Sequence, residues 1–361
     1  MKRLSTSQLT PGMVTAENVL SYNRQLIIPK GTELTDKLIT KLALYGILMI
    51  FVEDNVPEAA KDQVPTSSFH DSYSQRIKRS EAFKRFKKDY DDNVDKFKDT
   101  LDQVIRKNIQ LDVDILLENS LSFNTDLSGT VGILDMLQNM RDYDDSTFAH
   151  SMNVALICNI LGHWIGMNEG DIKLLTACGL LHDIGKLLVP KEIITKPARL
   201  SEYEFNEVKK HPVLGYNLLR TQNINENIKY AALMHHERYD GSGYPMGIIG
   251  QQINKYARIV SIVDVYDAMT AARVYRGPQC PFRVIEIFEQ EGYQKYDVQF
   301  LLPFLEHMVN NYLQNKCMLN DGRTGDIIFI NKEHLSRPVV QCDDQPIDLS
   351  ERWELSIEAI I

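Results

Sequence analysis

Helical periodicity dominates the hydrophobic pattern between about residues 108 and 315. Apolar residues recur there at three- and four-residue intervals, which places them on one face of an α-helix. One such face, over residues 172–181, ends directly at His182. Further helices are expected over 227–234 and 259–269, and short strands over 25–28, 47–52, 327–330 and 338–340. The pattern predicts a mainly α protein, with a small α+β N-terminal domain and a short β-rich tail.

Breaks in this pattern divide the chain into five expected parts. A polar stretch that contains Pro57 and Pro65 is typical of a linker. The parts are a small α+β regulatory or docking domain (1–54), the linker (55–74), a long helical connector (75–118), the main helical domain (119–315) and a β-rich C-terminal extension (316–361).

The charged helix expected after the linker carries a narrow apolar stripe. The stripe consists of Phe83, Phe86, Tyr90, Val94, Phe97, Leu101 and Val104. Alternating three- and four-residue spacing is the pattern of a helix seam, which would join two copies of the chain in a homodimer. The alternative is that the helix packs against its own domain. The run is too short for the pattern to decide between the two.

Composition and charge exclude several classes of protein. A formal net charge of −9 argues against broad binding to nucleic acid. The five cysteines include no CxxC pair, so neither a disulfide framework nor a cysteine zinc site is indicated. No apolar signal core follows the basic start, and no run reaches the ~18 apolar residues of a membrane span. A cytoplasmic protein without a membrane span is expected.

Histidine and aspartate gather in the helical region. The residues concerned are His150, His182, Asp183, His211, His235, His236 and Asp264. Each histidine ends or interrupts an apolar helical stretch, where its side chain can point into a bundle core. Buried imidazoles and carboxylates are costly unless they are paired or bind a metal. This ligand set favours Fe, Mn, Zn or Ni over calcium without selecting among them.

Asp183 and Lys186 are the expected catalytic residues. A carboxylate has two oxygens, so Asp183 can bridge two cations that activate a water for attack on a phosphoryl group. Lys186, one turn later, can place a positive charge beside the same phosphate. A lysine at this position also suits the C-terminal end of a helix dipole. Its closeness to His182 and Asp183 favours the substrate role.

Two motifs resemble those of the HD-GYP phosphohydrolases of the HD superfamily. They are residues 182–186 (HDIGK) and 235–245 (HHERYDGSGYP), and the resemblance continues through 257–259, Asp264 and 267–270 to cover roughly 120–315. It implies an all-helical HD-type bundle whose metal centre usually holds iron or manganese. It also implies hydrolysis of the bacterial second messenger cyclic di-GMP to pGpG, and in some members to GMP, by a metal-activated hydroxide. Some relatives prefer cyclic GMP-AMP.

The resemblance assigns roles to individual residues. The implied metal ligands are His150, His182, Asp183, His211, His235, His236 and Asp264. The implied substrate-binding residues are Lys186, Gly243, Tyr244, Pro245, Arg273 and Arg276. The resemblance also implies that the loop carrying Tyr244 contacts diguanylate cyclase (GGDEF) domains. Arg273 and Arg276 equally fit a solvated helix end, and the glycines of the loop fit tight turns.

Two departures from the family pattern change the expectation. Members with three metal ions carry a glutamate one turn before the first ligand histidine, where this chain has Ser146. A hydroxyl is a poor substitute for a bridging carboxylate, so two metal ions are expected rather than three. Asp144 and Asp145 lie nearby but on another helical face. Residues 272–276 (ARVYR) replace the usual Asp-Arg-Pro sequence, which affects the expected substrate preference rather than the metal site.

Three functions follow from these observations. The leading hypothesis is a metal-dependent cyclic di-GMP phosphodiesterase with a binuclear His/Asp centre. The second keeps this centre but changes the substrate to another nucleotide, such as cyclic GMP-AMP, a dNTP or (p)ppGpp. The third is a receptor that signals by binding a cyclic dinucleotide without cutting it. All seven expected ligand positions are filled, which favours catalysis over the receptor.

Overall fold

The computed structural model describes most of the chain. The described residues are 2–6, 9–10, 12–20, 26–35, 38–39, 42, 47, 49–53, 77–107, 109–123, 132–140, 147–196, 198–271, 279–343 and 345–361. They form two compact units, one within residues 1–71 and the other within residues 72–271 and 279–361. No helix within the described ranges is both long and apolar enough to cross a membrane.

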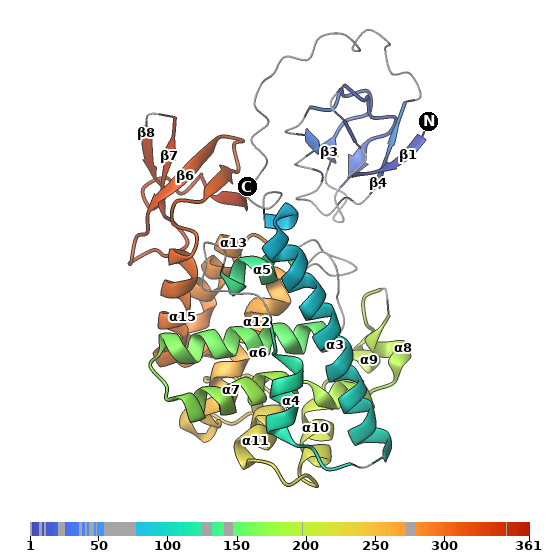
Figure 1. Ribbon diagram of the computed structural model, residues 1–361. Coiled ribbons are helices and arrows are strands. Elements are labelled where there is room, and N and C mark those ends of the chain that lie inside the picture. The colour runs from blue at the N-terminus through green and yellow to red at the C-terminus, as the bar shows by residue number, and fades with distance from the viewer. Residues whose placement is uncertain are drawn as a thin grey trace. The chain divides into compact units, whose positions relative to one another are not determined.

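The N-terminal unit contains two small antiparallel sheets (Figure 1). Strand β1 (Lys2–Ser5) pairs with β4 (Met49–Val52), and β2 (Val19–Leu20) pairs with β3 (Leu26–Ile28). The strands expected over 25–28 and 47–52 are therefore present. Its core consists of Leu9, Val19, Ile28, Leu34, Leu42, Ile50 and Val52.

The second unit is mainly helical (Figure 1). Its longer helices are α3 (Glu81–Lys107), α4 (Val113–Ser120), α5 (Ile133–Met140), α6 (Thr147–Trp164), α7 (Glu169–Leu181), α10 (His211–Leu219), α11 (Glu226–Met234), α12 (Lys255–Thr270) and α15 (Val298–Asn310). Its short elements are η3 (Ile184–Leu188), α8 (Lys191–Ile194), α9 (Glu202–Val208), η4 (Gly250–Gln252), α13 (Pro281–Ile287), the π-helix η5 (Phe288–Gly292) and α14 (Tyr293–Lys295). The helices expected over 172–181, 227–234 and 259–269 correspond to α7, α11 and α12.

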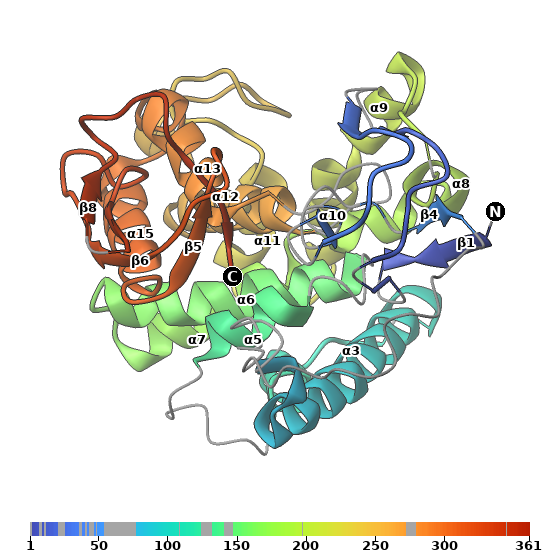
Figure 2. The same ribbon diagram turned by 90° about the horizontal axis from the view of Figure 1, so that it is seen from above.

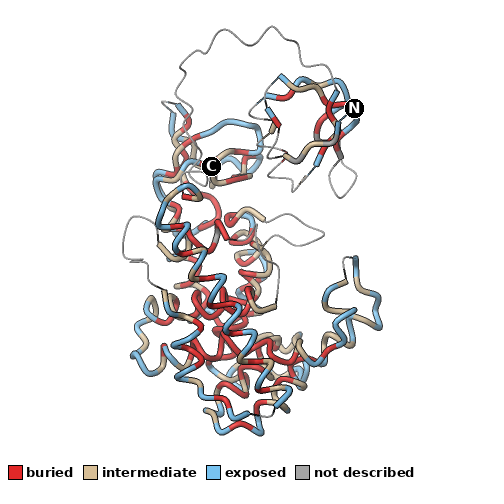
Figure 3. The backbone as a smooth tube through the Cα atoms, turned by 45° about the vertical axis from the view of Figure 1, so that its right-hand side comes forward, coloured by how far each residue is buried: buried red, intermediate tan, exposed pale blue. Residues whose placement is uncertain are grey.

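Helix α6 crosses the middle of this unit (Figure 1), and the buried residues concentrate in the interior of the unit (Figure 3). Residues 151–158 are all buried, so α6 is covered on every side and not only along one stripe. Helix α7 approaches it closely, because a Cβ atom at Gly179 would lie 3.0 Å from the Cα of Ala155. This central pair of helices carries His150 in α6 and His182 at the end of α7.

Helix α3 packs against its own domain. All seven residues of its apolar stripe are buried and belong to the core of the second unit. The hydroxyl of Tyr90 donates to Asn153 Oδ1 of α6 at 2.7 Å, and Phe97 packs edge-to-face against Phe148 with ring centroids 6.0 Å apart. The stripe is therefore not exposed for a second copy, and the expectation of a homodimer through this seam is wrong. The core of its own domain takes up that apolar surface.

The C-terminal segment forms a five-stranded antiparallel sheet beside α13 and α15 (Figure 2). The strand order is β8 (Gln345–Asp348), β7 (Val339–Cys342), β6 (Thr324–Phe329), β5 (Lys316–Leu319) and β9 (Ile357–Ile360). Leu319, Ile327 and Val340 belong to the same apolar core as the helices. The expected fold class, a helical bundle with a short β-rich tail, is confirmed, and the tail shares the core of the bundle.

Candidate metal centre

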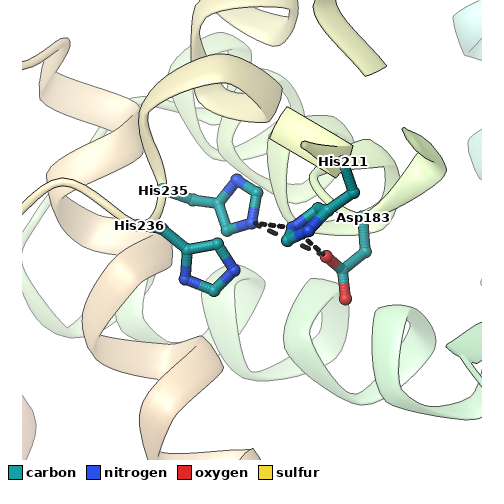
Figure 4. A group of neighbouring side chains, drawn as sticks. All are labelled: Asp183, His211, His235 and His236. Carbon is teal, nitrogen blue, oxygen red and sulfur yellow. Dashed lines mark hydrogen bonds and ion pairs between the residues drawn. The ribbon is translucent and has the colours of Figure 1, made fainter. Parts of the chain in front are cut away.

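Seven histidine and aspartate side chains converge in the helical unit from helices that are distant in the sequence. They form two groups, Asp183 with His211, His235 and His236, and His150 with His182 and Asp264. Within each group the potential ligand atoms all lie within 4.8 Å of one another. Figure 4 shows the first group, with the three imidazole rings and the carboxylate drawn close together. All seven predicted ligand residues are thus brought together.

Helix ends place most of these residues. His182 caps the C-terminus of α7, and Asp183 follows it before η3 begins. His211 is the first residue of α10. Helix α10 and η3 can meet because Gly185 has no side chain, since a Cβ atom there would lie only 2.0 Å from the carbonyl oxygen of His211. This contact sets Asp183 beside His211.

Backbone carbonyls fix the tautomers of three histidines. Nδ1 of His182 lies 2.7 Å from the carbonyl oxygen of Gly179. Nδ1 of His211 lies 2.6 Å from the carbonyl oxygen of Val208, and Nδ1 of His235 lies 3.0 Å from that of Ala232. A carbonyl oxygen can only accept, so each Nδ1 carries a hydrogen and donates it. In the neutral ring Nε2 then presents a lone pair. Second contacts of this kind are the usual means of orienting metal-bound histidines.

The resulting lone pairs face one another. Nε2 of His211 lies 3.2 Å from Nε2 of His235, and both face Oδ1 of Asp183 at 3.2 and 3.6 Å. Three acceptor atoms at these distances cannot bond to each other and are stabilised by a cation between them. All three residues are buried, which increases the cost of leaving them without one. These residues therefore fit a divalent metal ion.

The second oxygen of Asp183 faces the other group. Oδ2 lies 3.4 Å from Nε2 of His182 and 3.6 Å from Nε2 of His150. Oδ1 and Oδ2 thus address different pairs of histidines. This is the arrangement expected of a carboxylate that bridges two cations.

Asp267 is a member of the site that sequence reasoning did not single out. Its Oδ2 lies 2.8 Å from Nδ1 of His150, while Nε2 of that ring lies 3.0 Å from Oδ1 of Asp264. Asp264 and Asp267 are three residues apart on α12, so both carboxylates lie on the side facing α6. A carboxylate on Nδ1 orients the imidazole as the carbonyls do elsewhere in the site. The available signal was this three-residue spacing after Asp264.

Burial and pairing give these groups distinct charges. Burial opposes ionisation of Asp183, but Lys186, His182 and His211 together outweigh it and hold the pKa of that carboxyl well below its usual range. Burial opposes protonation of His150, but its hydrogen bonds to Asp264 and Asp267 and the charges of these carboxylates raise its pKa to about 9. Burial lowers the pKa of His235 to about 4. Near neutral pH the metal-free centre therefore combines the ionised carboxylate of Asp183 with a protonated His150 and a neutral His235. Ionised carboxylates and neutral imidazoles are the forms that bind metals, so a metal ion would displace one proton from His150.

The predicted substrate residues lie on two elements next to these groups. Lys186 in η3 donates from Nζ to Oδ2 of Asp183. The Tyr244 ring stacks on His236, with ring centroids 4.7 Å apart and an interplanar angle of 24°. Gly243 is required there, because a Cβ atom would lie 2.3 Å from the backbone nitrogen of Arg238.

The same loop is held in place by a buried carboxylate. Oε1 of Glu237 accepts a hydrogen bond from the backbone nitrogen of Met246 at 2.7 Å, closing the loop on either side of Tyr244 and Pro245. Ser146, Arg273 and Arg276 lie outside the described residues.

Residues 136–300 match the family model for the HD domain. This part of the chain is an HD domain. His182 belongs to one of the two ligand groups and the adjacent Asp183 to the other. All seven clustered residues lie within the matched range.

Two curated proteins are similar to the HD domain of this chain. One is the cyclic di-GMP phosphodiesterase response regulator RpfG of Xanthomonas campestris, 39% identical over 37% of this chain and 36% of that protein. The other is 3'3'-cGAMP-specific phosphodiesterase 1 of Vibrio cholerae, 41% identical over 40% of this chain and 34% of that protein. The chain spans about a third of the length of these relatives.

A solved structure is similar over more of the chain. It is that of Bd1817, an HDG"Y"P protein from Bdellovibrio bacteriovorus, which matches 85% of this chain and 99% of its own with a TM-score of 0.42 and 14% identity.

Proposed function

We propose that the protein is a metal-dependent phosphodiesterase that cuts a cyclic dinucleotide, with cyclic di-GMP as substrate and pGpG or GMP as the end product. The bridging position of Asp183 carries the proposal, because its two oxygens face different histidine pairs. The relatives of the HD domain support the substrate class, since they are named for cyclic di-GMP and for 3'3'-cGAMP. The proposed cofactors are two divalent ions, iron or manganese.

Each group of the centre has its own ligands for one ion. Asp183, His211, His235 and His236 would hold the first, and His150, His182 and Asp264 the second, with Asp183 shared. Bound at these positions, the two ions would supply Lewis acidity to the hydrolysis of a phosphate ester.

Lys186 and Tyr244 complete the proposed reaction site. An ammonium group has three hydrogens, so Lys186 can donate to Asp183 and still donate to the scissile phosphate and to the departing 3′ oxygen. Burial raises the pKa of Tyr244, so its hydroxyl stays protonated near neutral pH and can only act as a neutral hydrogen-bonding group. Its ring stacks on His236 at one edge of the centre. Gly243 and Pro245 shape this loop, and Arg273 and Arg276 are proposed to hold the nucleotide from the adjoining segment.

The test is turnover by protein loaded anaerobically with Fe(II) or Mn(II). We expect conversion of cyclic di-GMP to pGpG, seen by chromatography, and its loss when a chelator removes the metal. Cyclic GMP-AMP and a dNTP assayed in parallel rank the substrates and separate the cyclic-dinucleotide function from that of other HD phosphohydrolases. Folded protein with full metal occupancy that turns over no cyclic dinucleotide contradicts the proposal.

A further inference from the structure

Lys209 lies between α9 and α10, close to the metal centre. It is two residues before His211, and the carbonyl of its neighbour Val208 accepts from Nδ1 of that histidine. Its Nζ lies 5.2 Å from the ring centroid of Tyr244 and 5.0 Å from that of Phe205. Since the Tyr244 ring also stacks on His236, one aromatic side chain contacts both a predicted metal ligand and Lys209.

No carboxylate among the described residues neutralises the charge of Lys209. Two other lysines nearby are neutralised by carboxylates, because Lys186 contacts Asp183 and Lys210 contacts Glu207 at 2.6 Å. In the part of the chain that the structure describes, Lys209 forms no ion pair within 4.0 Å. In a protein with a net charge of −9, an uncompensated cation next to a phosphate-cutting centre favours an anionic ligand.

Aromatic rings next to Lys209 are exposed. On α9, which lies at the edge of the helical unit beside α8 and α10 (Figure 1), Phe205 is 49% exposed and Tyr203 is 70% exposed. A lysine held over two aromatic rings keeps its charge while its alkyl stem covers them. Exposed aromatic rings also stack on nucleobases, and every base offers a face for this contact.

We propose that Lys209, with Phe205 and Tyr244, forms a subsite for the second nucleotide of the substrate. Lys209 binds the phosphate that is not cut, and Phe205 stacks on the adjoining base. The scissile phosphate is assigned to Lys186 and the metal ligands, and the Tyr244 ring lies between these groups and Lys209. A cyclic dinucleotide carries its two phosphates on opposite sides of its ring, so it needs two separate cationic contacts. The proposal rests on the proposed function and extends it to substrate recognition.

Neighbouring lysines provide a matched test. We expect Lys209→Gln to raise KM for cyclic di-GMP about tenfold, which corresponds to ~1.4 kcal/mol, and to leave kcat within about twofold. Lys210→Gln removes an equal charge at the next position and is expected to leave KM unchanged. Lys209→Arg, which keeps the charge, restores most of the affinity. Metal content and melting temperature, measured on all three variants, are expected to match those of the wild type.

A small substrate separates the subsite from the reacting centre. Bis(p-nitrophenyl) phosphate has a single phosphate, so Lys209→Gln is expected to cut it as fast as the wild type. If Lys209→Gln loses turnover of both substrates equally, Lys209 acts at the scissile phosphate and the proposed subsite is wrong. Wild-type KM for cyclic di-GMP in Lys209→Gln also overturns it while leaving the proposed function intact. Absence of cyclic dinucleotide turnover in the wild type is instead the failure of the proposed function.

Discussion

Asp183 is the residue on which both groups of the centre depend. A buried carboxylate is stable as an anion only when cations or hydrogen-bond donors compensate it. In this protein Lys186 provides one such partner, while the four nearest imidazole Nε2 atoms surround the two oxygens. The same position explains why Asp183 is ionised and why it suits two metal ions at once.

Asp183→Asn tests this dual role. An amide offers one oxygen and one NH2 group, so the variant directs N–H hydrogens at one of the two histidine pairs or at its metal ion. We expect metal content to fall from two ions per chain to one or fewer. Turnover should fall by more than the ~10–100-fold that loss of an outer hydrogen-bond partner costs. Metal analysis and turnover on the same anaerobic preparation measure both effects.

The same variant separates an enzyme from a receptor. A cyclic di-GMP phosphodiesterase loses its biological effect together with hydrolysis. If Asp183→Asn abolishes hydrolysis and retains every biological effect, the protein signals by binding. Wild-type turnover by a correctly folded variant contradicts the bridging role itself.

Residue types and spacing were sufficient to predict which histidine and aspartate side chains cluster, but not the contacts that orient them. His182 and Asp183 at the end of α7, and Asp264 inside the apolar helix α12, are recognisable because buried polar residues are rare without a partner. The role of Asp267 depends on which atom of His150 it meets, and that is set by how α12 packs on α6. Lys209 likewise gains its significance only when the fold brings residue 244 beside residue 209.

At the scale of elements, packing decided what the patterns left open. The stripe of α3 has the same spacing whether its partner is α6 or a second copy, so only tertiary structure could choose between them. The contact of η3 with α10 was also invisible in the hydrophobic pattern. It depends on Gly185 and Gly215, whose backbones approach so closely that a Cβ atom at Gly185 would lie 2.5 Å from the Gly215 nitrogen.

Gly185→Ala is expected to separate these two elements. The added methyl group meets backbone atoms, which cannot rotate away as a side chain can. Overpacking of this kind costs about 1–3 kcal/mol, and clashes with backbone lie at the upper end. The free energy of unfolding in urea should fall by that amount, and metal content should fall because Asp183 moves away from His211.

Gly132→Ala is the matched control for that change. A Cβ atom at Gly132 has no neighbour within 4 Å in the described structure, so its stability and metal content should stay at the wild-type level. Equal stability of the two variants contradicts the close approach of η3 and α10.

At the scale of the whole molecule, the C-terminal sheet and the metal centre belong to one folded unit. Arg337 contacts Glu286 of α13 at 3.1 Å, and Glu289 accepts a hydrogen bond from the backbone nitrogen of Leu335 at 2.6 Å. Since the sheet also shares the apolar core, unfolding of this unit exposes the buried histidines. The free energy of unfolding of this unit should therefore depend on pH through the protonation of these histidines.

Metal-free protein is expected to be most stable near pH 6.5, the ordinary pKa of histidine. The pKa of His150 is raised to about 9, so its contribution is complete below pH 6.5 and is lost as the pH rises through 9. The pKa of His235 is lowered to about 4, so its contribution is complete above pH 6.5 and is lost as the pH falls towards 4. The alkaline arm has a slope of at most ~1.4 kcal/mol per pH unit, the value for one proton. The acidic arm is steeper, because burial lowers the pKa of His236 well below its usual value as well.

Urea unfolding of chelator-treated protein between pH 5 and 9 measures both arms of this dependence. His235→Phe should make the acidic arm shallower and leave the alkaline arm in place, because Phe cannot take up a proton in the unfolded chain whereas His236 still can. His150→Phe should do the reverse. Saturating Mn(II) should raise stability most where the imidazoles are neutral, since protons compete with metal for the same nitrogen atoms. A stability that rises steadily from pH 5 to 9 in metal-free protein contradicts the assignment of a charged His150 beside a neutral His235.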